Sequence, residues 1–231
     1  MWSAAERAAL FPMIEYVATE PLASRRIIWP KLKGKIEASV FTKLRSHKAL
    51  ASSGMLTNGE KLYYKNTGLR YFNTVTLRPP RCWINGRPTP SSRETVLDVH
   101  RDAKHIVHCY LLSSTFFSHY QATSNCRDLN PSDISEVPLP EIPKPFELFK
   151  AMSQEVESDY TKKGRIICMN NKLTGEVRLE SVTPARSKPL IDQIDAVFAK
   201  YVGFTLEELD HVTNYAIKYR MGQDSSEGEG E

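Results

Sequence analysis

Short runs of aromatic and β-branched residues, separated by turn-forming residues, fill the stretch from Lys61 to Leu97 and constrain the fold more than any other feature. The runs are Leu62–Tyr64, Tyr71–Phe72 and Val75–Leu77, and the breaks between and after them are Asn66–Gly68, Pro79–Pro80 and Asn85–Gly86. This pattern predicts short strands joined by turns. An Asn-Gly pair between two such runs also predicts a tight hairpin.

Apolar residues at helical spacing lie on both sides of this stretch. After Pro30, the apolar positions Ile36, Val40, Leu44 and Leu50 alternate with lysines and arginines and predict a basic amphipathic helix that ends before Gly54. A second apolar pattern predicts a helix over about Asp102 to His119. Helices on both sides of short strands indicate a mixed α+β fold, with a short-stranded sheet, flanking helices and a C-terminal helical segment.

The second half of the chain carries four further local signals. They predict a short helix that starts at Asn130–Asp133, a helix from Phe146 to Tyr160 ended by Gly164, a hairpin of Arg165–Met169 with Glu176–Leu179, and a helix start at Thr205–Glu208. In the last of these, threonine and glutamate occupy the two ends of a capping box, which satisfies exposed amides at a helix start.

Charge divides the chain. Residues 1–120 hold 18 Lys and Arg against 8 Asp and Glu, a net charge of +10, whereas residues 121–231 hold 13 against 19, a net charge of −6. Together with the element pattern, this predicts a basic part over 1–140 that faces DNA and a part over 141–222 that packs or docks a partner. An acidic tail without apolar residues, 223–231, is expected to be disordered. A basic half suits a protein that presents one face to a polyanion.

Several protein classes are disfavoured by what the sequence lacks. It has neither an apolar run of bilayer length nor the pattern of a signal peptide, so a cytoplasmic location without membrane contact is expected. Its four cysteines, spaced widely and without a C-x-x-C pair, are interpreted as reduced thiols. Phosphate-binding glycine loops and a nucleophile elbow are absent. His105 and His108 are interpreted as surface or packing residues, because metal ligands at suitable spacing are missing.

Basic and amide side chains at the breaks of the strand region are the candidate DNA contacts. Arginine and asparagine can bond guanine and adenine edges, lysine and arginine neutralise phosphates, and aromatic rings such as Trp83 can stack on bases or pack in a core. The predicted contacts are Lys65, Asn66, Arg70, Asn73, Arg78, Arg81, Arg87, Ser92, Arg93, Ser124, Asn125 and Arg127.

Three segments, in this order, resemble one known protein region. They are YYKNTGLRYFNTVT at Tyr63–Thr76, IVHCYLLSSTFFSHYQATSNCRDLNPSDISEVPLP at Ile106–Pro140 and KPLIDQIDAVFAKYVGFTLEELDHVTNYAIKYRMG at Lys188–Gly222. The set resembles the C-terminal target-recognition region of adenine-specific DNA methyltransferases of the fused restriction-modification and phage-defence type. The resemblance implies double-stranded DNA as a partner and a mixed α/β fold, with the loops around Lys65–Arg93 and Ser124–Arg127 facing DNA.

The catalytic half of that family is missing. There, a Rossmann-like domain binds S-adenosylmethionine and an Asn-Pro-Pro-Tyr-type motif holds the target adenine, whereas Asn130–Asp133 lacks the second proline and the aromatic residue. The chain is therefore expected to hold no cofactor and to lack catalysis of its own. S-adenosylmethionine would then bind a partner or a missing domain. Three origins stay open: a separate subunit, a truncated product or an excised domain.

Two other functions compete with DNA recognition. The chain could be a protein–protein adaptor that docks a catalytic methyltransferase or a restriction nuclease subunit and has little DNA affinity of its own. It could also be an enzyme such as a nuclease, although no cluster of carboxylates and lysine at metal-binding spacing is visible. The adaptor predicts an exposed apolar patch and binding that survives high salt.

Overall fold

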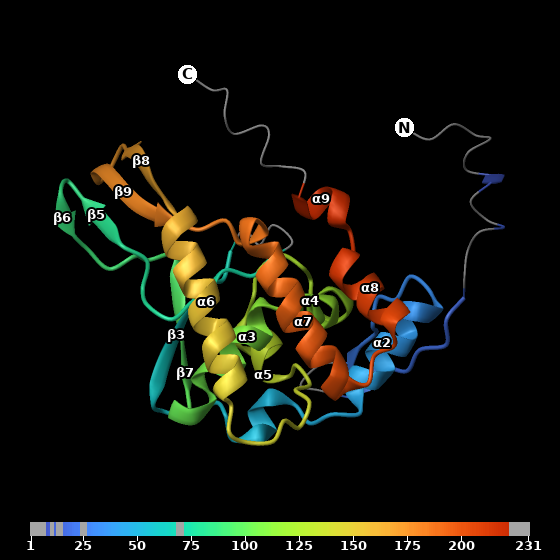
Figure 1. Ribbon diagram of the computed structural model, residues 1–231. Helices are drawn as coiled ribbons and strands as arrows, with labels where there is room; N and C mark the ends of the chain where they lie inside the picture. The colour runs from blue at the N-terminus through green and yellow to red at the C-terminus, as the bar shows by residue number, and fades with distance from the viewer. Residues whose placement is uncertain (1–7, 10–11, 13–15, 24–26, 68–71, 222–231) are drawn as a thin grey trace.

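The computed structural model describes residues 8–9, 12, 16–23, 27–67 and 72–221 (Figure 1). Helix accounts for 47% and strand for 20% of a mixed α+β fold, which confirms the predicted fold class. The helices are α2 (Lys35–Arg45), α3 (Lys104–Leu112), α4 (Ser114–Thr123), α5 (Pro131–Ser135), α6 (Glu147–Lys163), α7 (Lys188–Val202), α8 (Leu206–Asn214) and α9 (Ile217–Met221). The strands are β1 (Leu22–Ala23), β2 (Ile27–Ile28), β3 (Glu60–Lys65), β4 (Val75–Thr76), β5 (Cys82–Ile84), β6 (Arg87–Pro88), β7 (Glu94–Val99), β8 (Arg165–Asn171) and β9 (Gly175–Ser181). The predicted acidic tail, 223–231, lies outside the described residues.

The central strand β3 organises an antiparallel sheet in the order β4-β3-β7. Its side chains alternate between the core and the surface, so that Leu62 and Tyr64 are buried while Lys61 is exposed. Helix α3 packs on β3 and β4. The period-two pattern of the sequence therefore corresponds to one covered face of this sheet.

Helix α3 is the centre of the helical layer. It contacts α4, α6 and α7, and Figure 1 shows α6 and α7 running across the front of the body with α3 behind them. One hydrophobic core extends from Leu50 to Phe198 and includes residues of both predicted parts, 1–140 and 141–222. Both predicted parts therefore contribute side chains to the same core.

The single helix predicted over Asp102–His119 is wrong, because the chain breaks at Ser113. Ser113 has extended backbone angles, φ −68° and ψ 150°, and its hydroxyl accepts a hydrogen bond from the Phe116 amide at 3.0 Å. The buried Asp195 carboxylate accepts bonds from the Ser114 and Thr115 amides at 3.0 and 2.9 Å. The oxygens of Ser113 and Asp195 thus accept the first amides of α4, which have no partner within the helix, and a new helix begins at Ser114.

Other local predictions are confirmed. The Thr205 hydroxyl and the Glu208 side chain form the expected capping box, and Asn130 and Asp133 form a second one at α5. Asn85 and Gly86, with φ 49° and 77°, join β5 to β6 in the predicted hairpin. The basic helix after Pro30 is α2, but it ends at Arg45, earlier than predicted, and Leu50 lies in a separate 3-10 turn, Leu50–Ser53, with Gly54 at its end.

Gly164 follows α6, but it does not adopt the left-handed conformation of a glycine helix cap. Its φ is −62°, an angle open to any residue, so left-handed geometry does not explain it. A Cβ atom at this position would lie 2.8 Å from the Tyr160 carbonyl oxygen. Close approach of the backbone therefore favours glycine here.

A four-stranded antiparallel sheet in the order β6-β5-β9-β8 projects from the body at the upper left of Figure 1. We call this sheet, residues 81–89 and 165–181, the arm. The predicted hairpin of Arg165–Met169 with Glu176–Leu179 is confirmed as β8 and β9, whose main contacts are with each other and with β5. The arm therefore joins β5 to β9, whose paired residues, such as Trp83 and Arg178, lie far apart in the chain.

Among the described residues, no helix combines the length and the apolarity that crossing a bilayer requires.

Candidate nucleic-acid interface

The arm has two faces of different chemistry, set by its strand register. Directly opposed residues in antiparallel strands share a face. One face, which we call the apolar face, carries Cys82, Ile84, Ile167, Met169, Val177 and Leu179. Leu179, near the body, is 7% exposed, whereas Ile167 is 44% exposed. Much of this face is thus in contact with solvent.

Arginines border the apolar face at two opposite edges. Met169, Val177, Ile84 and Arg87 form one row across all four strands. At the other end of this row, Arg93 Nη2 lies 3.8 Å from Met169 Sδ. Arg87 and Arg93 are both exposed, so the row presents apolar atoms between two cations.

The opposite face is built around Trp83. Arg178 lies directly across from it on β9, and the guanidinium carbons of Arg178 and Arg81 are 5.8 and 6.0 Å from the centre of the indole. Cations at this distance interact favourably with an aromatic face. We call Arg81, Trp83 and Arg178 the Trp83 cluster.

Glu180 fixes the base of the arm. Arg78 donates to both of its carboxylate oxygens at 2.8 Å, and the Arg81 amide donates at 3.0 Å. The hydrogen bonds from Arg78, ahead of all other contributions, lower the pKa of Glu180 to about 2. Arg78 also lies 3.6 Å from Glu157. Arg78, a predicted DNA contact, thus forms ion pairs within the protein while its side chain stays 40% exposed, and the DNA contact remains a prediction. Arg81 shares Glu180 but keeps a side chain that is 57% exposed.

The tip of the arm is the turn between β8 and β9. The Asn171 side chain accepts hydrogen bonds from the Leu173 and Thr174 amides at 2.8 and 3.3 Å, which orders the turn. Leu173 is 95% exposed beside the exposed Lys172. A large apolar side chain thus stands in solvent at the far end of the projecting sheet.

A second group of predicted residues gathers where β3 ends and β7 begins. Lys65 pairs with Glu94, which places Arg93 at the same end of the three-stranded sheet. The Asn66 carbonyl accepts the Leu129 amide at 2.8 Å, and Thr67 bridges to Asp128. These bonds bring the loop with the exposed residues Asn125 and Arg127 against the end of β3. Through Arg93, this cluster is continuous with the arm.

Two predicted DNA contacts, Asn73 and Ser124, are buried. Asn73 is 2% exposed, and its amide donates to the Leu111 carbonyl at 2.8 Å. That carbonyl lies in the last turn of α3, where the helix break at Ser113 removes its intrahelical partner. Ser124 is 8% exposed, and its hydroxyl accepts the Cys126 amide at 3.0 Å. Both side chains stabilise the protein's own backbone.

Of the other predicted DNA contacts, Ser92 is exposed, while Lys65 and Asn66 are half-buried. Arg70 lies outside the described residues.

Sequence reasoning missed the contribution of β8 and β9 to this surface. Arg178 and Lys172 belong to a segment that was interpreted as packing or partner-docking. Their spacing in β8 and β9 carried a hairpin signal, but pairing of β9 with β5 is a long-range contact that no local pattern encodes. With these strands, the arm holds five Lys and Arg, namely Arg81, Arg87, Arg165, Lys172 and Arg178, against two carboxylates, Glu176 and Glu180, a net charge of +3.

Within the described part of the chain, no group of three or more His, Cys, Asp or Glu side chains is arranged to hold a metal ion. Comparisons of the chain with protein-family models, with curated proteins and with solved structures found no match.

Proposed function

We propose that this chain is a cytoplasmic DNA target-recognition module of an adenine-specific DNA methyltransferase or restriction-modification system. The observation that carries the proposal is the continuity of one surface. Cations and amides from the ends of β3 and β7, from the loop at Asn125–Arg127 and from the arm, most of them exposed, adjoin one another through Arg93. Duplex DNA is a polyanion whose phosphates bind such cations and whose base edges bind such amides.

The arm suits a groove of DNA. A two-stranded ribbon of β-structure fits the major groove, and sheets also enter the minor groove. The hairpin of β8 and β9 carries Asn170, Asn171 and Lys172 near its tip, and Arg93 and Arg87 lie at the two edges of the arm. In this proposal the asparagines contact base edges and the lysine and arginines contact phosphates.

The exposed Leu173 has a role of its own in this arrangement. Proteins that bend DNA insert apolar side chains between base steps from the minor groove. Leu173 stands at the end of the arm, 95% exposed, with Lys172 next to it to contact a phosphate. We assign Leu173 to such a wedge.

The methyl-transfer chemistry belongs elsewhere in this proposal. S-adenosylmethionine would bind a catalytic methyltransferase partner or domain, in line with the absence of its motifs from the sequence. The C-terminal part, 141–222, then docks that partner while the basic surface meets DNA.

The adaptor function remains the second candidate, and the apolar face of the arm favours it. Ile166 and Ile167 are 39% and 44% exposed, one on each face of the sheet, and exposed apolar surface is typical of protein docking sites.

A fluorescence-anisotropy titration of the full chain with a labelled random duplex, at about 50 and 200 mM salt, separates the two. Several phosphate contacts predict binding at low salt that weakens by roughly two decades or more at the higher salt. Absence of binding at both salt concentrations would contradict DNA recognition and favour the adaptor.

A further inference from the structure

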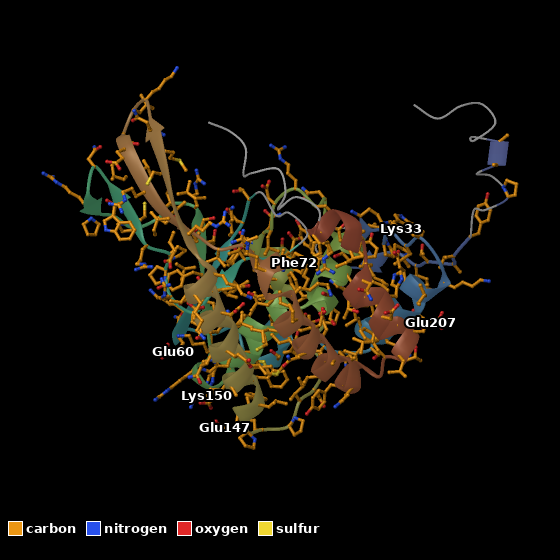
Figure 2. The ribbon with its side chains drawn as sticks, turned by 45° about the horizontal axis from the view of Figure 1, so that its top comes forward. Lys33, Glu60, Phe72, Glu147, Lys150 and Glu207 are labelled. Carbon is orange, nitrogen blue, oxygen red and sulfur yellow. The ribbon has the colours of Figure 1, made fainter. Side chains whose placement is uncertain are left out.

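A pocket of about 520 Å³ lies at the opposite end of the three-stranded sheet from the proposed DNA surface. Glu60 lines it at the start of β3, while Lys65 of the DNA surface ends the same strand, about 17 Å away at the usual rise per residue. Figure 2 shows Glu60, Glu147 and Lys150 together at this end. The volume is in the range of small-molecule sites.

Behind the pocket, a chain of hydrogen bonds joins His105, Ser153 and His108. Nδ1 of each histidine lies 2.9 Å from the Ser153 hydroxyl, and His108 Nε2 lies 3.1 Å from the Val75 carbonyl oxygen. His108 and Ser153 are fully buried. Burial lowers the pKa of His108 to about 4, so this ring is neutral at physiological pH.

The donor and acceptor of each of these hydrogen bonds follow from the bond between His108 and the Val75 carbonyl. A carbonyl only accepts, so His108 carries its proton on Nε2 and accepts at Nδ1. Ser153 therefore donates its proton to His108 and accepts from Nδ1 of His105. This leaves Nε2 of His105 as a bare acceptor. Burial, followed by the charge of Lys104, lowers the pKa of His105, which keeps the ring neutral.

His105 also lines the pocket, and no protein group in the described residues bonds to its Nε2. A ligand that uses this nitrogen must bring a neutral hydroxyl or N–H donor. An ionised ligand oxygen at the same point would be repelled by the lone pair on Nε2 of His105.

The pocket also offers cations that the protein leaves unpaired. Lys104 is paired with Glu60 at 3.1 Å, and Lys144 lies 3.7 Å from Asp102. Arg101 and Lys150 line the same pocket and form no ion pair in the described part of the chain, and Glu147 adds a third carboxylate to the lining. The four cations of the pocket therefore exceed its three carboxylates by one, a balance that suits an anion such as a phosphate monoester, whose second pKa is about 6.

We propose that this pocket binds a phosphate monoester that also carries a neutral hydroxyl or N–H group. The phosphate is held by Arg101 and Lys150, and the neutral group donates a hydrogen bond to Nε2 of His105. The side chain of Phe146 provides an apolar wall for the body of the ligand. This site is separate from the DNA surface and does not depend on DNA recognition.

The test is isothermal titration calorimetry of the full chain at pH 7.5 with adenosine 5′-monophosphate, adenosine and inorganic phosphate. The monophosphate is expected to bind at least about tenfold more tightly than either of the other probes, because only it makes both kinds of contact. Lys150→Ala should weaken its binding about tenfold or more, with Lys200→Ala on α7 as the control that leaves binding unchanged. Lys150 and Lys200 are both exposed, so neither change threatens the fold.

Nuclear magnetic resonance provides a readout that does not require a ligand. Nitrogen-15 spectra should show His105 protonated at Nδ1 and His108 protonated at Nε2, and addition of the monophosphate should shift the Nε2 resonance of His105. Equal binding of adenosine, equal binding of inorganic phosphate, unchanged binding in Lys150→Ala, or a proton on Nε2 of His105 would each overturn the proposal.

Discussion

Arg78 and Glu180 form a bidentate ion pair at the base of the arm, with both N–O distances at 2.8 Å. The pair connects the segment before β5 to the end of β9, two parts of the chain that are 102 residues apart. It thereby fixes the arm to the body and leaves the more distant arginines of the arm free for other partners.

Replacement of Glu180 tests this anchor. Glu180→Ala should lower the free energy of unfolding by about 2 kcal/mol, below the roughly 3–5 kcal/mol of a fully buried pair. The expected loss is smaller than that of a fully buried pair because the Arg78 side chain is 40% exposed and solvent screens its charge. Urea unfolding measures the change. Glu176→Ala, an exposed carboxylate on the same strand, should stay within about 0.5 kcal/mol. Equal effects of the two changes would refute the anchor.

The same pair predicts a pH dependence. The pKa of Glu180 in the folded protein is about 2, below the ordinary value of about 4.3 that it regains on unfolding. A lowered pKa stabilises the fold above pH 4.3, and this stabilisation is lost as the pH falls toward 2. The stability difference between the wild type and Glu180→Gln should therefore shrink across that interval. Unfolding curves at several acidic pH values measure it, and a constant difference would contradict the assigned pKa.

Arg87 and Arg93 should account for part of the salt dependence of DNA binding. Each phosphate contact contributes about 0.9 to the slope of log K against log salt concentration. The double variant Arg87→Ala, Arg93→Ala should therefore reduce the slope by about 1.8. Lys200→Ala, an exposed cation on α7, is the matched control and should leave the slope unchanged. An unchanged slope in the double variant would remove these arginines from the interface.

Leu173 should bend DNA. Leu173→Ser is expected to reduce the bend, measured by energy transfer between dyes at the two ends of a short duplex, because a serine cannot replace the apolar wedge. Its stability should remain within about 0.5 kcal/mol of the wild type, since the side chain packs on little. A bend that persists in the variant would show that the tip does not enter the base stack.

Substitution of Asn73 should change the stability of the protein, whereas substitution of Asn125 should change its affinity for DNA. Asn73→Ala leaves the buried Leu111 carbonyl without its partner and should cost about 1–3 kcal/mol, with DNA affinity of the folded protein unchanged. Asn125→Ala should weaken DNA binding and leave stability within about 0.5 kcal/mol, since this side chain is exposed. Thermal unfolding together with DNA titration checks both variants, and the reverse assignment of effects would contradict the placement.

Local chemistry made much of the fold predictable. The capping boxes at Thr205 and Asn130 and the turn at Asn85–Gly86 each depend on residues a few positions apart, so the sequence contains the whole interaction. The break at Ser113 was missed because it depends on Asp195, which lies 80 residues from Thr115 and bonds its amide. A periodic pattern reports a helical face but carries no information on distant carboxylates.

The candidate interface was predictable only in part, for the same reason. Arg87, Ser92, Arg93, Asn125 and Arg127 are exposed, as residue type and turn context indicated. The sequence could not separate Arg78 from these arginines, because Glu180, its partner, is brought to it by strand pairing. Nor could it place Arg178 beside Trp83, since that contact requires β5 and β9 to be neighbours.

Selection from a random duplex pool tests the central proposal most directly. The wild-type chain and a variant that replaces Arg87, Arg93 and Lys172 with alanine would each be incubated with the pool, and the bound fraction sequenced. DNA target recognition predicts that the wild type enriches one short motif and that the variant does not. Binding without enrichment, or equal enrichment by both proteins, would contradict the account.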